Sequence, residues 1–263
     1  KYTAVDGTPE LKKAIMKKFK RENKLNYSID QITVGTGGKQ VIYNAFMATL
    51  NKGDEVIIPA PFWVSYPDMV LLAGGKPKII KCSEKEGFKL TAKKLKKAIS
   101  KKTKWVILNS PSNPTGAAYS KKEIQDLAKV LIRNKKVNIL SDDIYEHVKY
   151  DNFNFFTIAQ ISKLKARTLT MNGVSKSYAM TGWRIGYAAG PKDIIKAIRK
   201  IQSQSTSNPS SISQAAAVEA LNGNQSFIKK RSDAFKVRRN FVVKSLNAIK
   251  GISCQKPNGA FYV

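Results

Sequence analysis

Short runs of β-favouring residues alternate with stretches of helical periodicity along nearly the whole chain, and this alternation restricts the possible fold more than any other feature. Between two such runs, Ile124, Leu127, Ala128 and Leu131 fall on one helical face. Alternation of this kind indicates an α/β fold with a mostly parallel, seven-stranded sheet flanked by helices. The strands are predicted at 32–34, 54–59, 76–81, 104–110, 137–143, 168–173 and 184–190.

Both ends of the chain carry further structural signals. Thr8 followed by Pro9 predicts the start of a helix, with Thr8 as its N-cap. From residue 191 to about residue 250 the chain is predicted to be mainly helical, with breaks near Asn208-Pro209 and Gly223-Asn224. The last residues, NGAFYV, resemble the beginning of a strand.

Composition excludes some classes of protein. No apolar run approaches the roughly eighteen residues that cross a bilayer, so no membrane association is expected. The net charge of +29 comes almost wholly from lysines scattered over many predicted helices, whereas proteins that read base sequence favour the arginine fork. We interpret the charge as a general lysine bias. No specific nucleic-acid partner is expected, only loose adhesion to polyanions at low salt.

Cysteine and histidine are too few for several kinds of site. Cys82 and Cys254 are far apart and lack CxxC spacing, which suggests neither a disulfide framework nor a zinc site. His147 is the only histidine, which excludes a multi-histidine metal site, and we expect neither Ser-His-Asp nor Cys-His catalysis. No metal is expected. Few cysteines and no export signal favour the cytoplasm, and a chain that begins at Lys1 is expected to be cut from a longer protein.

The first candidate for ligand binding is the glycine-rich turn GTGGKQ, residues 35–40, between a predicted strand and a helix. Such a turn leaves backbone N–H groups free, and the helix dipole attracts an anion there. It is not a P-loop, since Thr33 stands in place of the first glycine, and it is not GxGxxG, since Gln40 is not glycine. Alone, it predicts a phosphate site about as strongly as an ordinary turn.

Two more strand ends carry polar side chains. In SPSNPTG, residues 110–116, two prolines bracket Asn113 at the carboxyl end of a strand, where open α/β sheets bind ligands. Asp142 ends an apolar run, and a carboxylate buried there needs a cationic partner or several hydrogen-bond donors. The alternative is an ordinary helix N-cap, for which Asp143 is the better candidate.

Lys176 follows another predicted strand, and Arg184 stands eight residues later, before the next one. A lysine in a partly buried, positively polarised pocket has a lowered pKa and becomes a nucleophilic amine. In a chain this rich in lysine, however, a single lysine taken alone is expected to lie on the surface.

Six motifs, taken together and in order, resemble the class I pyridoxal-phosphate (PLP) aminotransferases of fold type I, in the aspartate aminotransferase family and its bacterial aspartate/prephenate-type subgroup. They cover essentially the whole chain: KYTAVDGTPELKKAI, GTGGKQ, PAPFWVSYP, NSPSNPTGA, SDDIYEH and SKSYAMTGWRIGY. The resemblance implies that residues 1–235 form the PLP-binding large domain. Residues 236–263 would begin a small domain that is largely missing from both ends of the chain.

The resemblance also implies a catalytic group. Lys176 corresponds to the lysine that forms a Schiff base with PLP, and Asp142 to the carboxylate that pairs with the pyridine nitrogen. Tyr145 and Asn113 correspond to hydrogen-bond donors to O3′ of the cofactor. Arg184 corresponds to the arginine that clamps the cofactor phosphate with its planar fork.

Further contacts to cofactor and substrate follow from the same resemblance. Gly38 and Lys39 correspond to the phosphate-cradling turn at a helix N-terminus. Trp63 corresponds to the aromatic side chain that stacks on the pyridine ring, and Trp63 and Asn113 are also expected to contact the substrate.

One position departs from the family pattern, and one implies a partner. Gly173 stands where some relatives have a phosphate-binding serine, and Ser175 is expected to substitute for it. Tyr2 corresponds to a tyrosine that reaches the phosphate in the neighbouring subunit. The resemblance therefore implies a homodimer with shared active sites.

The implied reaction transfers an amino group between an amino acid, with aspartate or glutamate expected, and a 2-oxo acid such as 2-oxoglutarate, as in amino-acid biosynthesis. Lys176 would move the proton of the substrate Cα as base and then acid. Alternatives are an aromatic or prephenate aminotransferase, a β-lyase, or an inactive fragment or sensor that only binds PLP. The arginine that binds the substrate α-carboxylate lies, in the family, beyond the GAFYV motif.

Overall fold

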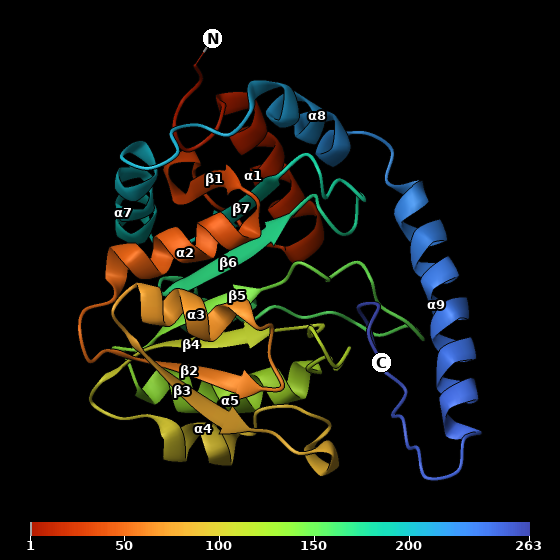
Figure 1. Cartoon of the computed structure of the whole chain (residues 1–263). Coiled ribbons are helices and arrows are strands. Elements are labelled where there is room, and N and C mark those ends of the chain that lie inside the picture. The colour runs from red at the N-terminus through yellow and green to blue at the C-terminus, as the bar shows by residue number, and fades with distance from the viewer. Residues whose placement is uncertain (1) are drawn as a thin grey trace.

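The computed structural model describes residues 2–263. Within them, seven strands form one mixed sheet in the order β1-β7-β6-β5-β4-β2-β3 (Figure 1). Strands β6, β5, β4, β2 and β3 run parallel, whereas β7 is antiparallel to both of its neighbours. The predicted α/β fold with a mostly parallel sheet is confirmed. The strands are β1 (Ile32–Thr36), β2 (Glu55–Ala60), β3 (Lys76–Lys81), β4 (Thr103–Asn109), β5 (Asn138–Asp142), β6 (Thr168–Gly173) and β7 (Ile185–Ala189).

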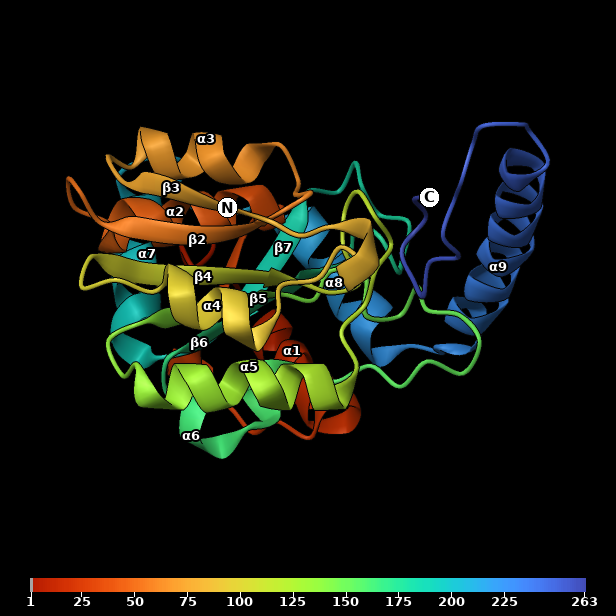
Figure 2. The same cartoon turned by 90° about the horizontal axis from the view of Figure 1, so that it is seen from below.

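Helices cover both faces of the sheet (Figures 1 and 2). Helices α2, α3 and α7 pack on one face, and α1, α4, α5, α6 and α8 on the other, while α9 stands away from the sheet. They are α1 (Pro9–Asn23), α2 (Gly38–Thr49), α3 (Ser65–Leu72), α4 (Ala92–Ala98), α5 (Lys121–Arg133), α6 (Ser162–Lys165), α7 (Lys192–Ser203), α8 (Ser211–Asn222) and α9 (Ser226–Asn247), with short 3-10 turns η1 (Ile29–Gln31), η2 (Glu84–Glu86) and η3 (Ile158–Gln160).

The core lies in layers between the sheet and its helices. On the first face, Phe46 of α2 and Val70 of α3 pack with Trp105 of β4. On the second face, one group gathers around α1 and α8, including Phe19, and another around α4 and α5, including Leu131. Burial of both faces explains why the strands read as continuous apolar runs rather than as alternating ones.

Local signals in the sequence account for several helix ends. The Thr8 side chain accepts a hydrogen bond from the Leu11 N–H, with Pro9 in the first turn, as predicted. Ser120 and Glu123 form a capping box at the start of α5. The predicted breaks in the helical region are confirmed, because α7, α8 and α9 are separate helices.

The last residues do not form the predicted strand. They make one antiparallel bridge, Lys149 to Gly259, and otherwise run irregularly. Tyr150 N–H donates to Asn258 O at 2.9 Å, and Ala260 N–H donates to Val148 O at 2.8 Å. The segment meets a turn region rather than a sheet edge, so it has no strand to extend along. The strand prediction is therefore wrong for this segment.

The division of the chain between residues 235 and 236 stays a prediction, and the point falls within helix α9. Arg239 of α9 donates to Asp151 Oδ2 and to Pro257 O, both at 2.7 Å. These bonds connect α9 to the loop after β5 and to the end of the chain. None of the helices described over residues 2–263 is both long and apolar enough to cross a membrane.

Candidate active site

The strand directions bring distant loops together at one edge of the sheet. Strands β1, β2, β4, β5 and β6 all end there, and the antiparallel strand β7 begins there. A cavity of about 300 Å³ opens at this edge. Ligand sites of open α/β sheets form beyond the carboxyl ends of the strands. The cavity is lined by Gly38, Lys39, Trp63, Tyr66, Asn109, Asn113, Asp142, Ile144, Tyr145, Met171, Ser175, Lys176, Thr181 and Arg184.

The structure brings nine of the ten predicted site residues to this cavity. They are Gly38, Lys39, Trp63, Asn113, Asp142, Tyr145, Ser175, Lys176 and Arg184. Tyr2 does not line it, and its side chain is 87% exposed. The predicted contact of Tyr2 concerns a second subunit, and it stays a prediction, as do the individual roles of the other nine.

At one end of the cavity, Arg184 approaches the turn between β1 and α2. Gly37 is the N-cap of α2, so no side chain caps the first N–H groups of this helix. A Cβ atom at Gly37 would lie 2.1 Å from Nη2 of Arg184, so any other residue there would displace the guanidinium from this position. Arg184 precedes β7 directly and donates from Nη1 to Thr181 O at 2.9 Å. Uncapped helix N–H groups and a guanidinium are groups that favour an anion.

Lys176 lies on an irregular turn after β6, half-buried in the cavity wall. Burial lowers the pKa of its amine, and the positive charge of Arg184 lowers it further, while the carboxylate of Asp142 opposes both. The Lys176 Nζ atom lies 5.7 Å from the ring centre of Tyr145 and 5.4 Å from that of Phe261. This lysine therefore differs physically from a solvated surface lysine.

Asp142 ends β5 and is buried, with its side chain facing the same cavity. Burial raises the pKa of its carboxyl to about 6, although hydrogen bonds from Tyr66 and the Ile144 N–H and the charge of Lys176 favour the ionised form. Tyr66 donates its hydroxyl to Asp142 Oδ2 at 2.6 Å. The carboxyl is therefore held in one orientation.

The SPSNPTG loop places Asn113 through Asn109, the last residue of β4. Asn109 Oδ1 accepts the backbone N–H of Asn113 at 2.8 Å, and Asn109 Nδ2 donates to the Asp142 carbonyl at 3.0 Å. One amide thus connects the loop after β4 with the end of β5. Asn109 and Tyr66 line the cavity, but sequence reasoning did not single them out.

Aromatic side chains close the remaining walls. Lys39 Nζ lies 5.1 Å from the ring centre of Trp63, and the Trp63 ring meets that of Tyr66 edge-on at 5.3 Å. The Tyr145 hydroxyl lies 2.8 Å from that of Tyr262, at the end of the chain. Burial and this neighbour both raise the pKa of Tyr145, so its phenol stays protonated and can donate.

Asp143 is not the helix N-cap that its position suggests. A turn rather than a helix follows it, with the Glu146 N–H donating to Asp143 O at 2.9 Å. Its Oδ1 accepts from the Ser141 hydroxyl at 2.7 Å, and its buried Oδ2 has no hydrogen-bond partner among residues 2–263. Burial and the nearby carboxylate of Glu146 raise the pKa of Asp143 to about 7.

Comparison with known proteins identifies the family. The family model for aminotransferase class I and II matches residues 1–263, the whole chain. The chain belongs to the class I and II aminotransferases. Among members of this family, it is 62% identical over 264 residues to the aspartate/prephenate aminotransferase of Cereibacter sphaeroides, covering 100% of this chain and 66% of that protein.

Solved aminotransferase structures share the fold. The crystal structure of the Rhizobium meliloti aspartate aminotransferase superposes with a TM-score of 0.98 at 60% identity, covering 99% of this chain and 65% of that one. The Thermus thermophilus aspartate aminotransferase with maleate gives a TM-score of 0.95 at 41% identity, covering 99% and 68%. The chain thus spans roughly two thirds of the length of these aminotransferases.

Proposed function

We propose that this chain carries the PLP site of an aspartate-type aminotransferase. The observation that carries the proposal is that Lys176 and Asp142, thirty-four positions apart in the sequence, face one cavity that Arg184 and Gly38, at the start of α2, also line. An amine, a carboxylate and a phosphate-binding turn match the three polar parts of PLP: its aldehyde, its ring nitrogen and its phosphate.

The donor set fits PLP at each of these parts. The uncapped N–H groups at the start of α2 and the guanidinium of Arg184 suit a phosphate, in a space that a Cβ at Gly37 would fill. Asp142, with its pKa raised to about 6 by burial, is mostly ionised at pH 7 and suits a protonated ring nitrogen. Trp63 offers an aromatic face, and Ser175 offers a further hydroxyl at the cavity wall.

Bound PLP would act as an electron sink for the charge left when a substrate loses its Cα proton. The side chains of this chain would do the rest. Because the pKa of Lys176 is lowered, more of its amine is neutral at a given pH, and it can accept the Cα proton and return it. Asp142 would hold the proton on the ring nitrogen. The Tyr145 phenol and Asn113 amide would donate to the cofactor oxygen.

The substrates we propose are aspartate or glutamate and a 2-oxo acid such as 2-oxoglutarate. Support comes from the names of the relatives and from the Thermus thermophilus enzyme, which was solved with maleate, a dicarboxylate. The Cereibacter sphaeroides name also favours prephenate as an alternative substrate.

A homodimer in the cytoplasm belongs to the same proposal. Val64, Leu71 and Leu72 expose 72%, 58% and 70% of their surface on and beside α3, next to the cavity residue Trp63. Such an apolar patch beside a site suits a second copy of the chain. Cys82 and Cys254 are free thiols, as is usual in a reducing compartment.

The test is to incubate the protein with PLP, reduce it with borohydride and locate the label by mass spectrometry. We expect label concentrated on Lys176 and lost in Lys176→Ala, whereas Lys93→Ala, an exposed lysine of α4, leaves the pattern unchanged. Label spread evenly over surface lysines would contradict the proposal. Amino transfer from aspartate to 2-oxoglutarate, compared with transfer to prephenate, then tests the substrate.

A further inference from the structure

The turn that carries Lys176 is held by its next residue. Residues 174–178 form neither helix nor strand, and backbone hydrogen bonds such as Ala179 N–H to Lys176 O, at 3.1 Å, are supplemented by hydrogen bonds to side chains. Ser177 is 4% exposed, and its Oγ lies 2.9 Å from Nδ1 of His147. His147 follows Tyr145 by two residues. A single hydrogen bond thus connects the turn of the proposed reactive amine with the turn of the proposed phenol donor.

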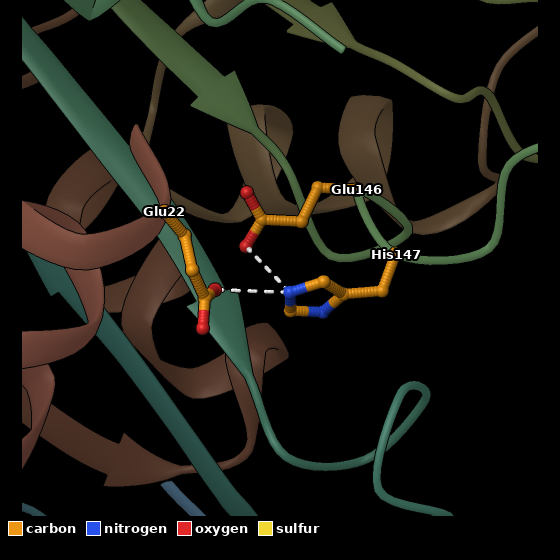
Figure 3. Close-up of side chains that lie close together, drawn as sticks. All are labelled: Glu22, Glu146 and His147. Atoms are coloured by element: carbon orange, nitrogen blue, oxygen red, sulfur yellow. Dashed lines mark hydrogen bonds and ion pairs between the residues drawn. The ribbon is translucent and has the colours of Figure 1, made fainter. Parts of the chain in front are cut away.

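The other ring nitrogen of His147 is anchored in helix α1. Nε2 lies 2.9 Å from Oε2 of Glu22 and 4.0 Å from Oε1 of Glu146 (Figure 3). Burial raises the pKa of Glu22, but the hydrogen bond from His147 and the charge of Lys18 outweigh it and lower the pKa to about 2. The ionised Glu22 can only accept, so Nε2 donates to it and Nδ1 faces Ser177.

This bond survives a change in protonation of the imidazole. A hydroxyl both donates and accepts, so Ser177 can donate to a neutral Nδ1 or accept from a protonated one. The Glu22 carboxylate accepts from Nε2 in either case. The hydrogen bond that connects the two turns is therefore expected in either protonation state, so it does not act as a pH switch.

The carboxylates around His147 form an ion-paired scaffold. One ligand atom from each of Glu22, Glu146 and His147 fits within 4.8 Å, a spacing that also suits a metal ion. However, the buried amine of Lys18 already pairs with both glutamates, at 3.5 Å for Glu22. Asn23 donates to Glu146 as well, at 2.7 Å. Because a cation already occupies the centre, we assign the cluster to holding His147 in place.

We infer that His147 is a positioning residue, which holds the Lys176 turn to the Tyr145 turn through Ser177, while Glu22 orients the imidazole for that hydrogen bond. The inference rests on the proposed function, since it gives the position of Lys176 a purpose. The amine stands on a flexible four-carbon stem, so its reach depends on where the turn fixes its Cα. A misplacement of about 1 Å in a reacting group costs on the order of 100-fold in rate.

The chain offers a matched set of variants. His147→Asn keeps an amide near the position of Nδ1 and so keeps a partner for Ser177. His147→Gln keeps an amide near the position of Nε2 and so keeps the anchor to Glu22 only. Ser177→Ala removes the same hydrogen bond from the other side. If the connection acts through Ser177, the Asn variant rescues and the Gln and Ala variants do not.

Two measurements on the protein without PLP test whether the Lys176 turn is held in place. Amide hydrogen exchange over residues 174–181 should be about 2- to 10-fold faster in His147→Gln and Ser177→Ala, as expected for one lost hydrogen bond. In His147→Asn it should stay within about twofold of the parent protein. Exchange in α5 should not change in any of the three.

The second measurement is the pH dependence of Lys176 acetylation by limiting acetic anhydride, read by mass spectrometry. Burial and Arg184 lower the pKa of Lys176 and Asp142 opposes them, so a turn freed from the cavity wall should lose much of the depression. The midpoint should move upward in His147→Gln and Ser177→Ala and not in His147→Asn.

The inference is overturned if His147→Asn behaves like His147→Gln, or if exchange quickens over the whole chain, which would indicate a general loss of stability. It is also overturned if neither measurement changes in Ser177→Ala. Both measurements omit PLP, so they decide the role of His147 even where borohydride labelling fails. Failure of the proposed function is thus distinguished from failure of this inference.

Discussion

At the scale of single residues, the pair Tyr66 and Asp142 sets the charge at the centre of the cavity. The Tyr66 hydroxyl favours the ionised carboxylate, whose pKa burial has raised to about 6. We expect Tyr66→Phe to raise the pKa of Asp142 by about one to two units, since a hydrogen bond to a charged group contributes roughly 1.5–3 kcal/mol. The titration of carboxyl groups by NMR in aspartate-labelled protein measures this shift.

Phenylalanine is a suitable replacement because the ring itself is part of the core. Tyr66 is 2% exposed and meets Trp63 edge-on, a contact that Phe retains. A matched control is Tyr119→Phe, whose hydroxyl accepts the Leu90 N–H away from the cavity. An Asp142 pKa that is unchanged in Tyr66→Phe, or lowered, would contradict the assigned hydrogen bond.

The sequence predicted those site residues that belong to a recognisable motif. It did not predict the residues that only orient these groups by hydrogen bonds. Lys176, Asp142 and Arg184 follow from motifs and lie on one cavity. Tyr66 and Asn109 orient those groups by hydrogen bonds that only the folded chain shows. The one signal for Tyr66 was its place three residues after Trp63, on the same side of a helical turn.

At the scale of elements, the junction of β1 and α2 decides whether an anion site exists. Gly37 has φ 85° and ψ 159°, a region that is essentially restricted to glycine, and a Cβ there would meet the guanidinium of Arg184. We expect Gly37→Ala to cost on the order of 1–3 kcal/mol in stability and to weaken PLP binding by at least about tenfold. Urea unfolding and a fluorescence titration with PLP measure the two effects.

Gly53→Ala separates backbone strain from the clash. Gly53 also has a positive φ, of 90°, but within residues 2–263 no atom beyond its own residue and its two chain neighbours lies within 4 Å of the position of its Cβ. We expect this variant to lose stability while binding PLP as the parent protein does. Equal loss of PLP binding in both variants would show that strain alone, and not the space beside Arg184, controls the site.

Elements were predictable where the local pattern and the tertiary environment agree. Strand β3 runs over the predicted residues 76–81, and α1 begins at the predicted cap Thr8. The segment NGAFYV failed because its β-favouring residues pack against a turn, with Gly116 and Val148 as backbone partners. A strand requires a neighbouring strand, and no local pattern specifies one.

At the scale of the whole molecule, carboxyl groups with shifted pKa values make the free energy of unfolding depend on pH in two opposite ways. The pKa of Glu22 is lowered to about 2 in the folded chain, so its contribution is present above about pH 4.5 and is lost as the pH falls toward 2. The pKa values of Asp142 and Asp143 are raised to about 6 and about 7. For these two, the folded chain binds more protons than the unfolded chain between about pH 4 and 7, so stability falls as the pH rises through this window.

Asp143 provides the sharpest test of this balance, because its Oδ2 is buried without a partner among residues 2–263 and it lies outside the cavity lining. Asn at this position keeps the acceptor for Ser141 and never ionises. We expect the stability of Asp143→Asn relative to the parent to increase with pH, so that its advantage at pH 8 exceeds that at pH 5 by on the order of a few kcal/mol. Urea unfolding at both pH values in 0.3 M salt, which screens the net charge of +29, measures the difference.

The control is Asp126→Asn, which replaces an exposed carboxyl that pairs with Lys129, and its stability should change little with pH over this range. An equal advantage of Asp143→Asn at pH 5 and pH 8 would mean that the buried carboxyl does not titrate in this window.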